Sequence, residues 1–372
     1  MNLGAINPAA KIYLRPINFI ESPQHHDGET ARLAGGLIWF SGVELVLKHD
    51  GAITRSIVAV ANWEAAVASM PAPVAVRAAS LFGRLTLPRV ALQLGARVVR
   101  LDQPQVMGIL NITPDSFSDG GKYGDDAAAA ASAAIAQAGA GAAIIDIGGE
   151  STRPNAAVIW EGDEIARVGP VIRQIAPSGT AMSIDTRKAA VMEDALAGGA
   201  HMINDVSALL YDDRALQVAV NAGVPVALMH APGQGSDLHK GEGYGDVVTE
   251  VFDWLEARVD AAVAAGISRD LILIDPGIGF GKSLADNLAI INNLAMFHGI
   301  GCAMLFGASR KRMIGALSNE ADVEQRLGGS VFLAMKAVER GAQILRVHDV
   351  PETVQAIRVW RGLRDSALTA RV

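Results

Sequence analysis

The chain has 372 residues, of which half are hydrophobic and 19% are charged, so it can bury a large core. Its net charge of −7 argues against nucleic acid or an anionic membrane as the main partner, and an anionic substrate would need a local cluster of basic groups. The single cysteine, Cys302, excludes an internal disulfide and a metal site built from cysteines.

Residues 1–95 form a segment that does not share the repeat found later in the chain. Its start lacks the layout of a signal peptide, and the apolar stretch at 33–47 contains Glu44 and is shorter than the about 20 residues that cross a bilayer. We therefore expect a cytoplasmic protein. "KIYLRPINF" and "GLIWFSGVELVL" predict strands, and "NWEAAVASM" and "VAVRAASLFG" predict helices. The segment is thus expected to be a small N-terminal α/β extension of unknown role, and "ARVVRLDQPQ" after it a hairpin or lid under the floor of the main domain.

Eight short apolar runs follow, and each leads into a polar residue or a glycine. The residues that follow the runs are Asn111, Gly148, Asp185, Asn204, His230, Asp275, Ser309 and His348. Apolar side chains on successive residues indicate parallel strands that are buried on both faces. Helical stretches such as "DDAAAAASAAIAQAG" lie between the runs. Eight such units predict a (β/α)8 TIM barrel over residues 96–372, with a doubly wound open sheet as the alternative.

Polar residues at the carboxyl ends of these strands predict the active site, because TIM barrels carry their sites there. The group combines carboxylates, amides, histidines and basic side chains: Asn111, Asp146, Asp185, Asn204, His230, Asp275, Ser309, Arg310, Lys311, Arg346 and His348. Strand ends can also be polar because they meet solvent. So varied a set at all eight ends favours a site.

Asp185 and Asp275 each end a largely apolar run, so each carboxylate needs hydrogen-bond donors or a shifted pKa. The N–H and amino edge of a heterocycle offers two donors to one carboxylate. Asn204 can both donate and accept, which suits a pteridine or a purine. Lys311 can bind a ring oxygen or nitrogen. A structural salt bridge, for instance between Asp185 and Arg187, is the alternative.

Two loops have the composition of anion-binding loops. "GGESTRP" brings two hydroxyls and Arg153 after the second strand, and "GASRKRMIG" places Ser309 and three basic residues after the seventh. Loops at this end of the barrel and helix N-termini often bind phosphate. A solvated basic turn explains "SRKR" by itself equally well.

Taken in order, these motifs resemble those of the dihydropteroate synthase family, pterin-binding enzymes of folate biosynthesis. The shared segments are "MGILNITPDSFSDGG", "DIGGESTRP", "SIDTRK", "INDVS", "LMH", "DPGIGFGK", "GASRK" and "ILRVHDV". The resemblance implies a transferase that condenses 7,8-dihydropterin-6-ylmethyl diphosphate with 4-aminobenzoate, giving 7,8-dihydropteroate and diphosphate. It also implies small-molecule substrates only, competition by sulfonamides, and a homodimer, for which "VEQRLGGSVFLAMKAVERG" is a candidate interface if it is not simply buried.

The resemblance assigns roles to individual residues. The pterin-binding residues are Asp185, Asn204, Met229, Asp275, Lys311 and Arg346. The diphosphate-binding residues are Asn111, Arg346 and His348, with a Mg²⁺ ion at Asn111. The aminobenzoate-binding residues are Phe117, Thr152, Arg153, Pro154, Phe280 and Ser309. The catalytic residues are Asp185, Lys311, Arg346, His348 and Asp115, and the loop at 112–121 is expected to close over both substrates.

The sequence departs from the family pattern in two loops. Asn155 stands where glycine is usual, and "HAPGQGSDLHKGEGYG" replaces a stretch of the P-x-T-M type after the fifth strand. Two other functions remain as alternatives. A pterin-binding methyltransferase domain would not need "TPDSFSDGG" and "SRK". A non-catalytic pterin-binding paralogue is disfavoured by Arg153, Lys311 and His348.

Overall fold

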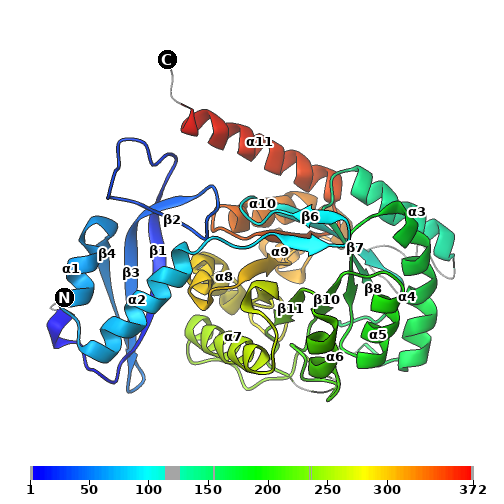
Figure 1. Ribbon diagram of the computed structural model, residues 1–372, viewed down its shortest axis with the longest axis horizontal. Coiled ribbons are helices and arrows are strands. Elements are labelled where there is room, and N and C mark those ends of the chain that lie inside the picture. Colours follow the sequence, from blue (N-terminus) through cyan, green and yellow to red (C-terminus); the bar gives the residue numbers. More distant parts are fainter. Residues whose placement is uncertain (1–2, 114–125, 154–155, 234, 236, 370–372) are drawn as a thin grey trace.

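The computed structural model describes residues 3–113, 126–153, 156–233, 235 and 237–369 (Figure 1). Four residues that carry predictions lie outside these ranges: Asp115, Phe117, Pro154 and Asn155. The same holds for most of the loop at 112–121, so its expected closure is not addressed by the structure.

Eight parallel strands form a closed barrel. The strands are β7 (Gln105–Asn111), β8 (Ile144–Gly148), β9 (Met182–Asp185), β10 (Met202–Asp205), β11 (Val226–Met229), β12 (Ile272–Asp275), β13 (Ala303–Phe306) and β14 (Ile344–Val347). Each pairs in parallel with the next strand in the chain, and β14 pairs with β7 to close the ring. All eight apolar runs are strands, so the TIM-barrel prediction is confirmed and the open sheet is excluded.

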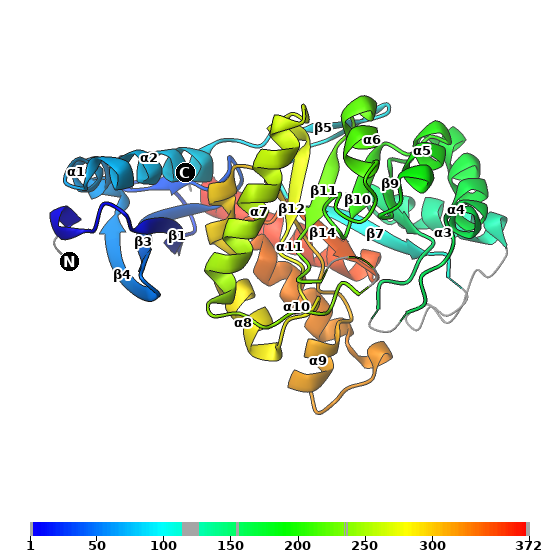
Figure 2. The same cartoon turned by 90° about the horizontal axis from the view of Figure 1, so that it is seen from below.

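Helices surround the barrel (Figure 2). They are α3 (Ala127–Gly139), α4 (Glu161–Ile175), α5 (Ala189–Ala197), α6 (Ala215–Ala222), α7 (Val247–Ala264), α8 (Leu284–Asn292), α9 (Arg312–Leu317), α10 (Leu327–Val338) and α11 (Val350–Leu368). Side-chain caps fix several starts: the Asp126 carboxylate accepts hydrogen bonds from the first turn of α3, and Ser283 with Asp286 forms a capping box at α8. None of the described helices is long and apolar enough to cross a membrane.

A short antiparallel hairpin closes the floor of the barrel. It consists of β5 (Leu92–Leu94) and β6 (Arg97–Val99). Leu92, Leu94 and Val99 are buried in a cluster with residues near the starts of the barrel strands, such as Met107 and Met202. A hairpin therefore lies under the floor as expected, but only its second strand belongs to the predicted stretch at 96–105. It spans residue 95, the predicted boundary, so part of the predicted extension completes the barrel core.

The N-terminal extension is an antiparallel sheet with two helices, as predicted. The sheet contains β1 (Lys11–Ile20), β2 (Ala31–Arg32), β3 (Trp39–His49) and β4 (Ala52–Ala59), and the helices are α1 (Trp63–Ala68) and α2 (Ala72–Thr86). It lies beside the barrel near α7 and α8 (Figure 1). Buried residues of the two parts belong to one continuous hydrophobic cluster, so they share a core.

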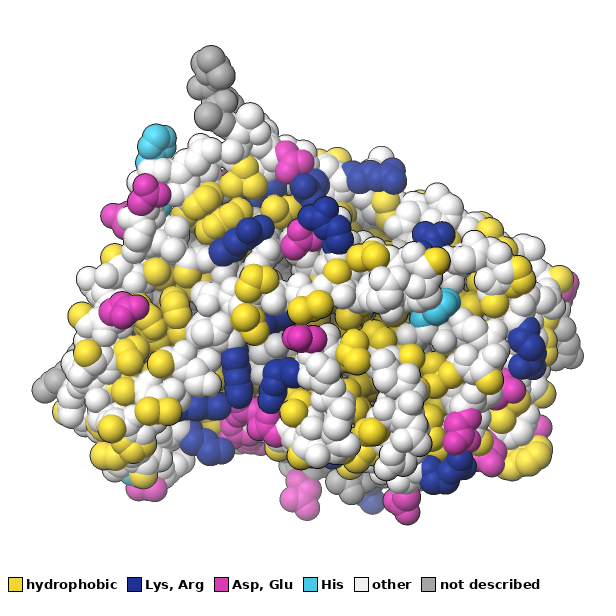
Figure 3. Space-filling model, in the orientation of Figure 1, with side chains coloured by type: hydrophobic (Ala, Val, Ile, Leu, Met, Phe, Trp, Pro, Cys, Tyr) yellow, Lys and Arg dark blue, Asp and Glu magenta, His cyan; other side chains and the backbone are white. Residues whose placement is uncertain are grey.

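Ion pairs reinforce the junction between the extension and the barrel. Arg77 and Arg84 of α2 both bind Glu256 of α7, at 2.6 and 2.9 Å. Lys11 binds Asp253, also on α7, at 2.8 Å. Figure 3 shows basic and acidic side chains gathered together on this side of the molecule. Helix α7 is thus held from outside by the extension.

Candidate active site

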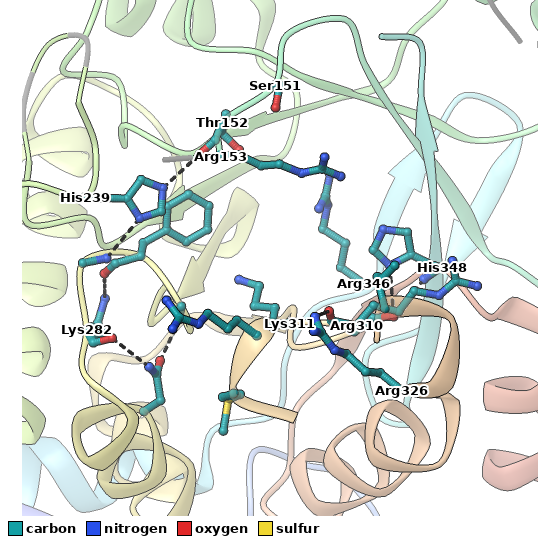
Figure 4. A pocket seen from close by; sticks show the side chains of 18 of the residues that line it. Ser151, Thr152, Arg153, His239, Lys282, Arg310, Lys311, Arg326, Arg346 and His348 are labelled. Atoms are coloured by element: carbon teal, nitrogen blue, oxygen red, sulfur yellow. Dashed lines mark hydrogen bonds between the residues drawn. The ribbon is translucent and has the colours of Figure 1, made fainter. Parts of the chain in front are cut away.

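The carboxyl ends of the barrel strands open into a cavity of about 960 Å³ (Figure 4). The residues predicted from the sequence that line it are Asn111, Thr152, Arg153, Asp185, Phe280, Ser309, Arg310, Lys311, Arg346 and His348. They come from β7, β9 and β14 and from the loops that follow β8, β12 and β13. The structure therefore brings most of the predicted site residues together around one cavity.

Arg346 joins two carboxylates across the mouth of the barrel. Its Nε donates to Asp146 Oδ2 on β8 at 2.6 Å, and its Nη2 donates to Asp185 Oδ2 on β9 at 2.6 Å. The Asn204 amide donates to the same Asp146 oxygen at 2.9 Å. Asp146 Oδ1 is buried without a hydrogen-bond partner in the described part of the chain, so this cluster retains an unpaired acceptor.

The salt bridge considered between Asp185 and Arg187 is not formed. Arg187 Nε instead donates to Glu150 Oε2 at 3.0 Å, and Lys188 Nζ donates to Glu150 Oε1 at 3.0 Å. Both basic side chains are almost fully buried, so they need a carboxylate partner that is equally shielded from water. Glu150 belongs to the "GGESTRP" loop, and these bonds fix the base of that loop.

Burial shifts the protonation equilibria of the charged groups in the cavity. It raises the pKa of Asp185, against the opposing Arg346 charge and together with the nearby Asp146 carboxylate. Burial likewise raises the pKa of Asp275, which the Lys311 charge opposes. The pKa of Lys311 falls to about 8, because burial outweighs the attraction of Asp275. Burial thus favours the uncharged forms of both acids and of the lysine.

Three residues predicted to bind pterin do not line the cavity. Asn204, Met229 and Asp275 are buried at the ends of β10, β11 and β12. The Asp275 Oδ1 accepts a hydrogen bond from the Gly277 amide at 2.7 Å. Met229 belongs to a small apolar cluster against which Phe280 packs. These residues adjoin the cavity wall, with Asn204 linked through Asp146 to Arg346.

Lys311 follows β13, and His348 follows the neighbouring strand β14. Lys311 Nζ donates to the Ile278 carbonyl and lies 4.6 Å from the centre of the Phe280 ring. His348 Nδ1 is 3.1 Å from Ser309 Oγ. Burial, with the Arg346 charge adding to it, lowers the pKa of His348 to about 3. His348 is therefore a neutral imidazole near pH 7 and can act as a hydrogen-bond donor or acceptor there.

His230 lies behind the cavity and does not line it. Its Nδ1 is 2.9 Å from Lys282 Nζ, and its ring packs edge-on against Trp254 at 4.9 Å. Lys282 also donates to the Gly277 and Phe280 carbonyls, which shapes the loop after β12. Although His230 follows the fifth strand, its contacts are structural.

His239 is a cavity residue that the sequence did not reveal. It lies in the loop between β11 and α7 and contacts Thr152 and the loop after β12 (Figure 4). Its ring stacks on Phe280 with centroids 5.1 Å apart. The only signal in the sequence was that this loop departs from the family pattern.

The chain is similar to a group of characterised enzymes. A family described as pterin binding enzyme matches residues 107–348. The dihydropteroate synthase of Neisseria meningitidis serogroup B is 44% identical over 275 residues, which cover 73% of this chain and 96% of the relative. That of Escherichia coli strain K12 is 45% identical over 262 residues, covering 70% of this chain and 91% of the relative.

Solved structures are similar as well. The Xanthomonas albilineans dihydropteroate synthase with 4-aminobenzoic acid has a TM-score of 0.69 and 45% identity, covering 74% of this chain and 98% of that chain. The Yersinia pestis enzyme in complex with a sulfonamide drug has a TM-score of 0.70 and 43% identity, covering 74% of this chain and 100% of that chain. The matches cover almost all of each relative but only about three quarters of this chain, so this chain contains residues that they lack.

Proposed function

This chain belongs to the pterin-binding enzyme family, as a dihydropteroate synthase, and from that premise we propose how its residues carry out the reaction. The enzyme is a transferase of folate biosynthesis that joins 7,8-dihydropterin-6-ylmethyl diphosphate to 4-aminobenzoate, with release of diphosphate. The observation that carries this function is the identity of 45% to an enzyme solved with 4-aminobenzoic acid. Diphosphate release from the two substrates with Mg²⁺ tests it, and binding without release would favour a non-catalytic paralogue.

We propose that the pterin ring binds next to the carboxylates on β8, β9 and β12. Asp275 and Asn204 would pair with the N–H and amino edge of the ring, as buried acceptors need donors. When the bond between the methylene carbon and the diphosphate oxygen breaks, the electron-rich ring spreads the positive charge. The raised pKa of Asp185 brings its titration closer to neutral pH, and in its charged form this carboxylate stabilises the cationic ring.

We assign the departing diphosphate to Arg346, His348 and Asn111. Arg346 supplies a permanent positive charge, and the neutral His348 imidazole supplies a hydrogen bond. Asn111 ends β7 on the cavity wall, and groups of three or more metal-ligating acids, histidines or cysteines are absent from the described residues. One neutral amide oxygen fits Mg²⁺, since this ion keeps several waters and takes its remaining ligands from phosphate oxygens. Bound there, Mg²⁺ would neutralise diphosphate charge.

We place 4-aminobenzoate between the loop after β8 and the loops after β12 and β13. Thr152, Arg153, Phe280 and Ser309 bound this space, and Phe117 and Pro154 complete it in our proposal. The aniline nitrogen attacks the methylene carbon and then loses a proton. Because an aniline nitrogen carries an unshared pair at neutral pH, placement matters more than a strong general base. Sulfonamides, one of which is bound in the Yersinia pestis structure, are expected to compete here.

Asp275→Asn is expected to weaken pterin binding by about 1–3 kcal/mol, because a charge-assisted pair becomes a neutral one. Titration calorimetry with the pterin substrate measures this change. Asp260→Asn, at an exposed position on α7, serves as the control. An unchanged affinity for Asp275→Asn would remove Asp275 from the pterin site.

Lys311 is expected to set the alkaline limit of activity. Its pKa of about 8 means that the ammonium is present below that pH and is lost as the pH rises through it. The value of kcat/KM for the pterin substrate should therefore fall above pH 8, since this ratio reports groups of the unliganded enzyme. In Lys311→Arg the side chain keeps its charge above pH 8, so the fall in kcat/KM should be absent. A fall at the same pH in both enzymes would assign this fall to another group.

We also propose a homodimer formed through α10 and its neighbour α11. Phe332 of α10 is 66% exposed, and Val359 and Leu363 of α11 are 62% and 66% exposed. Large apolar side chains at this exposure on adjoining helices suit a self-complementary interface. Light scattering is expected to give twice the mass of the chain, and Phe332→Asp is expected to give a monomer. A monomeric wild type would contradict the proposal.

A further inference from the structure

We infer that His239 is a positioning residue for 4-aminobenzoate, holding together two loops that bound the acceptor site. This inference rests on the proposed function, and it assigns a role to the loop that departs from the family pattern. His239 lies between β11 and α7. Both of its ring nitrogens form hydrogen bonds, and one face of the ring stacks on Phe280.

The hydrogen bonds fix the chemical form of the ring. Nε2 is 3.0 Å from the Thr152 carbonyl oxygen, which can only accept, so Nε2 carries the proton. Nδ1 accepts a hydrogen bond from the Gly281 amide at 3.3 Å, so Nδ1 carries the lone pair. A neutral imidazole with hydrogen on Nε2 satisfies both partners, and a protonated ring would lose the second bond.

One face of the His239 ring stacks on Phe280, in the loop after β12. The rings of His239 and Phe280 are 5.1 Å apart and inclined by 12°. Phe280 in turn lies 4.6 Å from Lys311 Nζ. His239 therefore fixes the Thr152 backbone on one loop and the Phe280 ring on another, and both residues line the cavity.

The surrounding loop is built to present the imidazole at this point. Leu238, the preceding residue, is buried in the apolar cluster with Met229. The Asp237 carboxylate accepts from the His239 amide at 2.9 Å. Gly281 has φ of +54°, and a Cβ there would lie 2.6 Å from the His239 carbonyl oxygen. Only glycine lets the two loops approach this closely.

The test compares variants of His239 in the full chain by steady-state kinetics. His239→Ala is expected to raise KM for 4-aminobenzoate about tenfold, since it removes two hydrogen bonds and a stacked ring. KM for the pterin substrate should stay within about twofold, because the direct contacts of the His239 ring are to Thr152, Gly281 and Phe280, none of which is assigned to the pterin. His239→Gln supplies one donor and one acceptor and is expected to recover most of the loss. Lys240→Ala, at the exposed neighbouring residue, is the matched control.

The outcomes separate the inference from the function on which it rests. Two results would overturn the positioning role if the wild type is active. In the first, His239→Ala has an unchanged KM for 4-aminobenzoate. In the second, it raises the KM values for both substrates equally. If His239→Ala does not fold, His239→Phe decides: it keeps the stacked ring without the hydrogen bonds, so it should bind 4-aminobenzoate more weakly than His239→Gln does. Equal binding by these two variants would also overturn the inference. A wild type that forms no dihydropteroate would overturn the proposed function itself.

Discussion

Replacing Arg346 with alanine is expected to lower kcat/KM about a thousandfold, the largest loss for any single residue of the site. The change removes the guanidinium that we assign to the diphosphate. It also leaves Asp146 and Asp185 buried side by side without the cation that now binds both at 2.6 Å. Without the Arg346 charge the pKa of Asp185 should rise further, so less of the carboxylate that we propose stabilises the cationic pterin ring remains charged.

Arg346→Lys tests whether the positive charge alone is sufficient, without the two hydrogen bonds of the guanidinium. Lysine keeps the charge, but a single ammonium cannot reproduce two hydrogen bonds in different directions, so we expect only partial recovery. Circular dichroism and thermal unfolding should accompany the kinetics, because breaking a buried ion pair can cost about 3–5 kcal/mol of stability. Arg358→Ala, at an exposed position of α11, controls for the loss of an arginine. A loss below tenfold in Arg346→Ala would contradict the role given to this residue.

Leu81→Ala is expected to lower the free energy of unfolding of the chain by about 3–5 kcal/mol. Leu81 lies on α2 of the extension and is fully buried. Its closest neighbours include Gly299, just before β13. A Cβ added to this glycine would lie 3.3 Å from Leu81 Cδ2 and 3.5 Å from Phe252 of α7, so little space separates the leucine from the barrel. Truncation would leave a cavity inside the shared core.

The matched control is Val76→Ala on the same helix, where the side chain is 72% exposed and the loss should be within about 0.5 kcal/mol. Urea unfolding of both variants, followed by circular dichroism and by turnover, gives the free energies. A single transition that shifts for both probes is expected. If circular dichroism showed an early transition that left turnover intact, the extension would be an independent domain.

The barrel could be predicted from the sequence because its signals are local. Strands buried on both faces are apolar on successive residues, and each signal ends where the strand meets the cavity. The ends of strands such as β7, β9 and β12 also place Asn111, Asp185 and Asp275 at the same end of the barrel without any further information. The order of apolar runs and polar residues along the chain was therefore enough to predict which end of the barrel carries the site.

The partners of these residues could not be predicted, because they depend on packing between distant segments. Arg346 and Asp185 are 161 positions apart, and nothing local selects this pair over Asp185 with Arg187. His239 and Thr152 are 87 positions apart, and a lone histidine in a polar loop gives no sign of a contact. The strands of the extension were visible for the same local reason as the barrel strands, but its docking on α7 was not.

The contacts between the extension and α11 have a consequence for synthesis on the ribosome. Gln24 donates to the Leu368 carbonyl, and Arg364 binds Glu21 and the Leu37 carbonyl, so the first and last parts of the chain are joined. The extension can therefore complete these contacts only after α11 has been synthesised. Such long sequence separations slow folding. We expect chaperones to have access to this part of the extension until α11 has been synthesised.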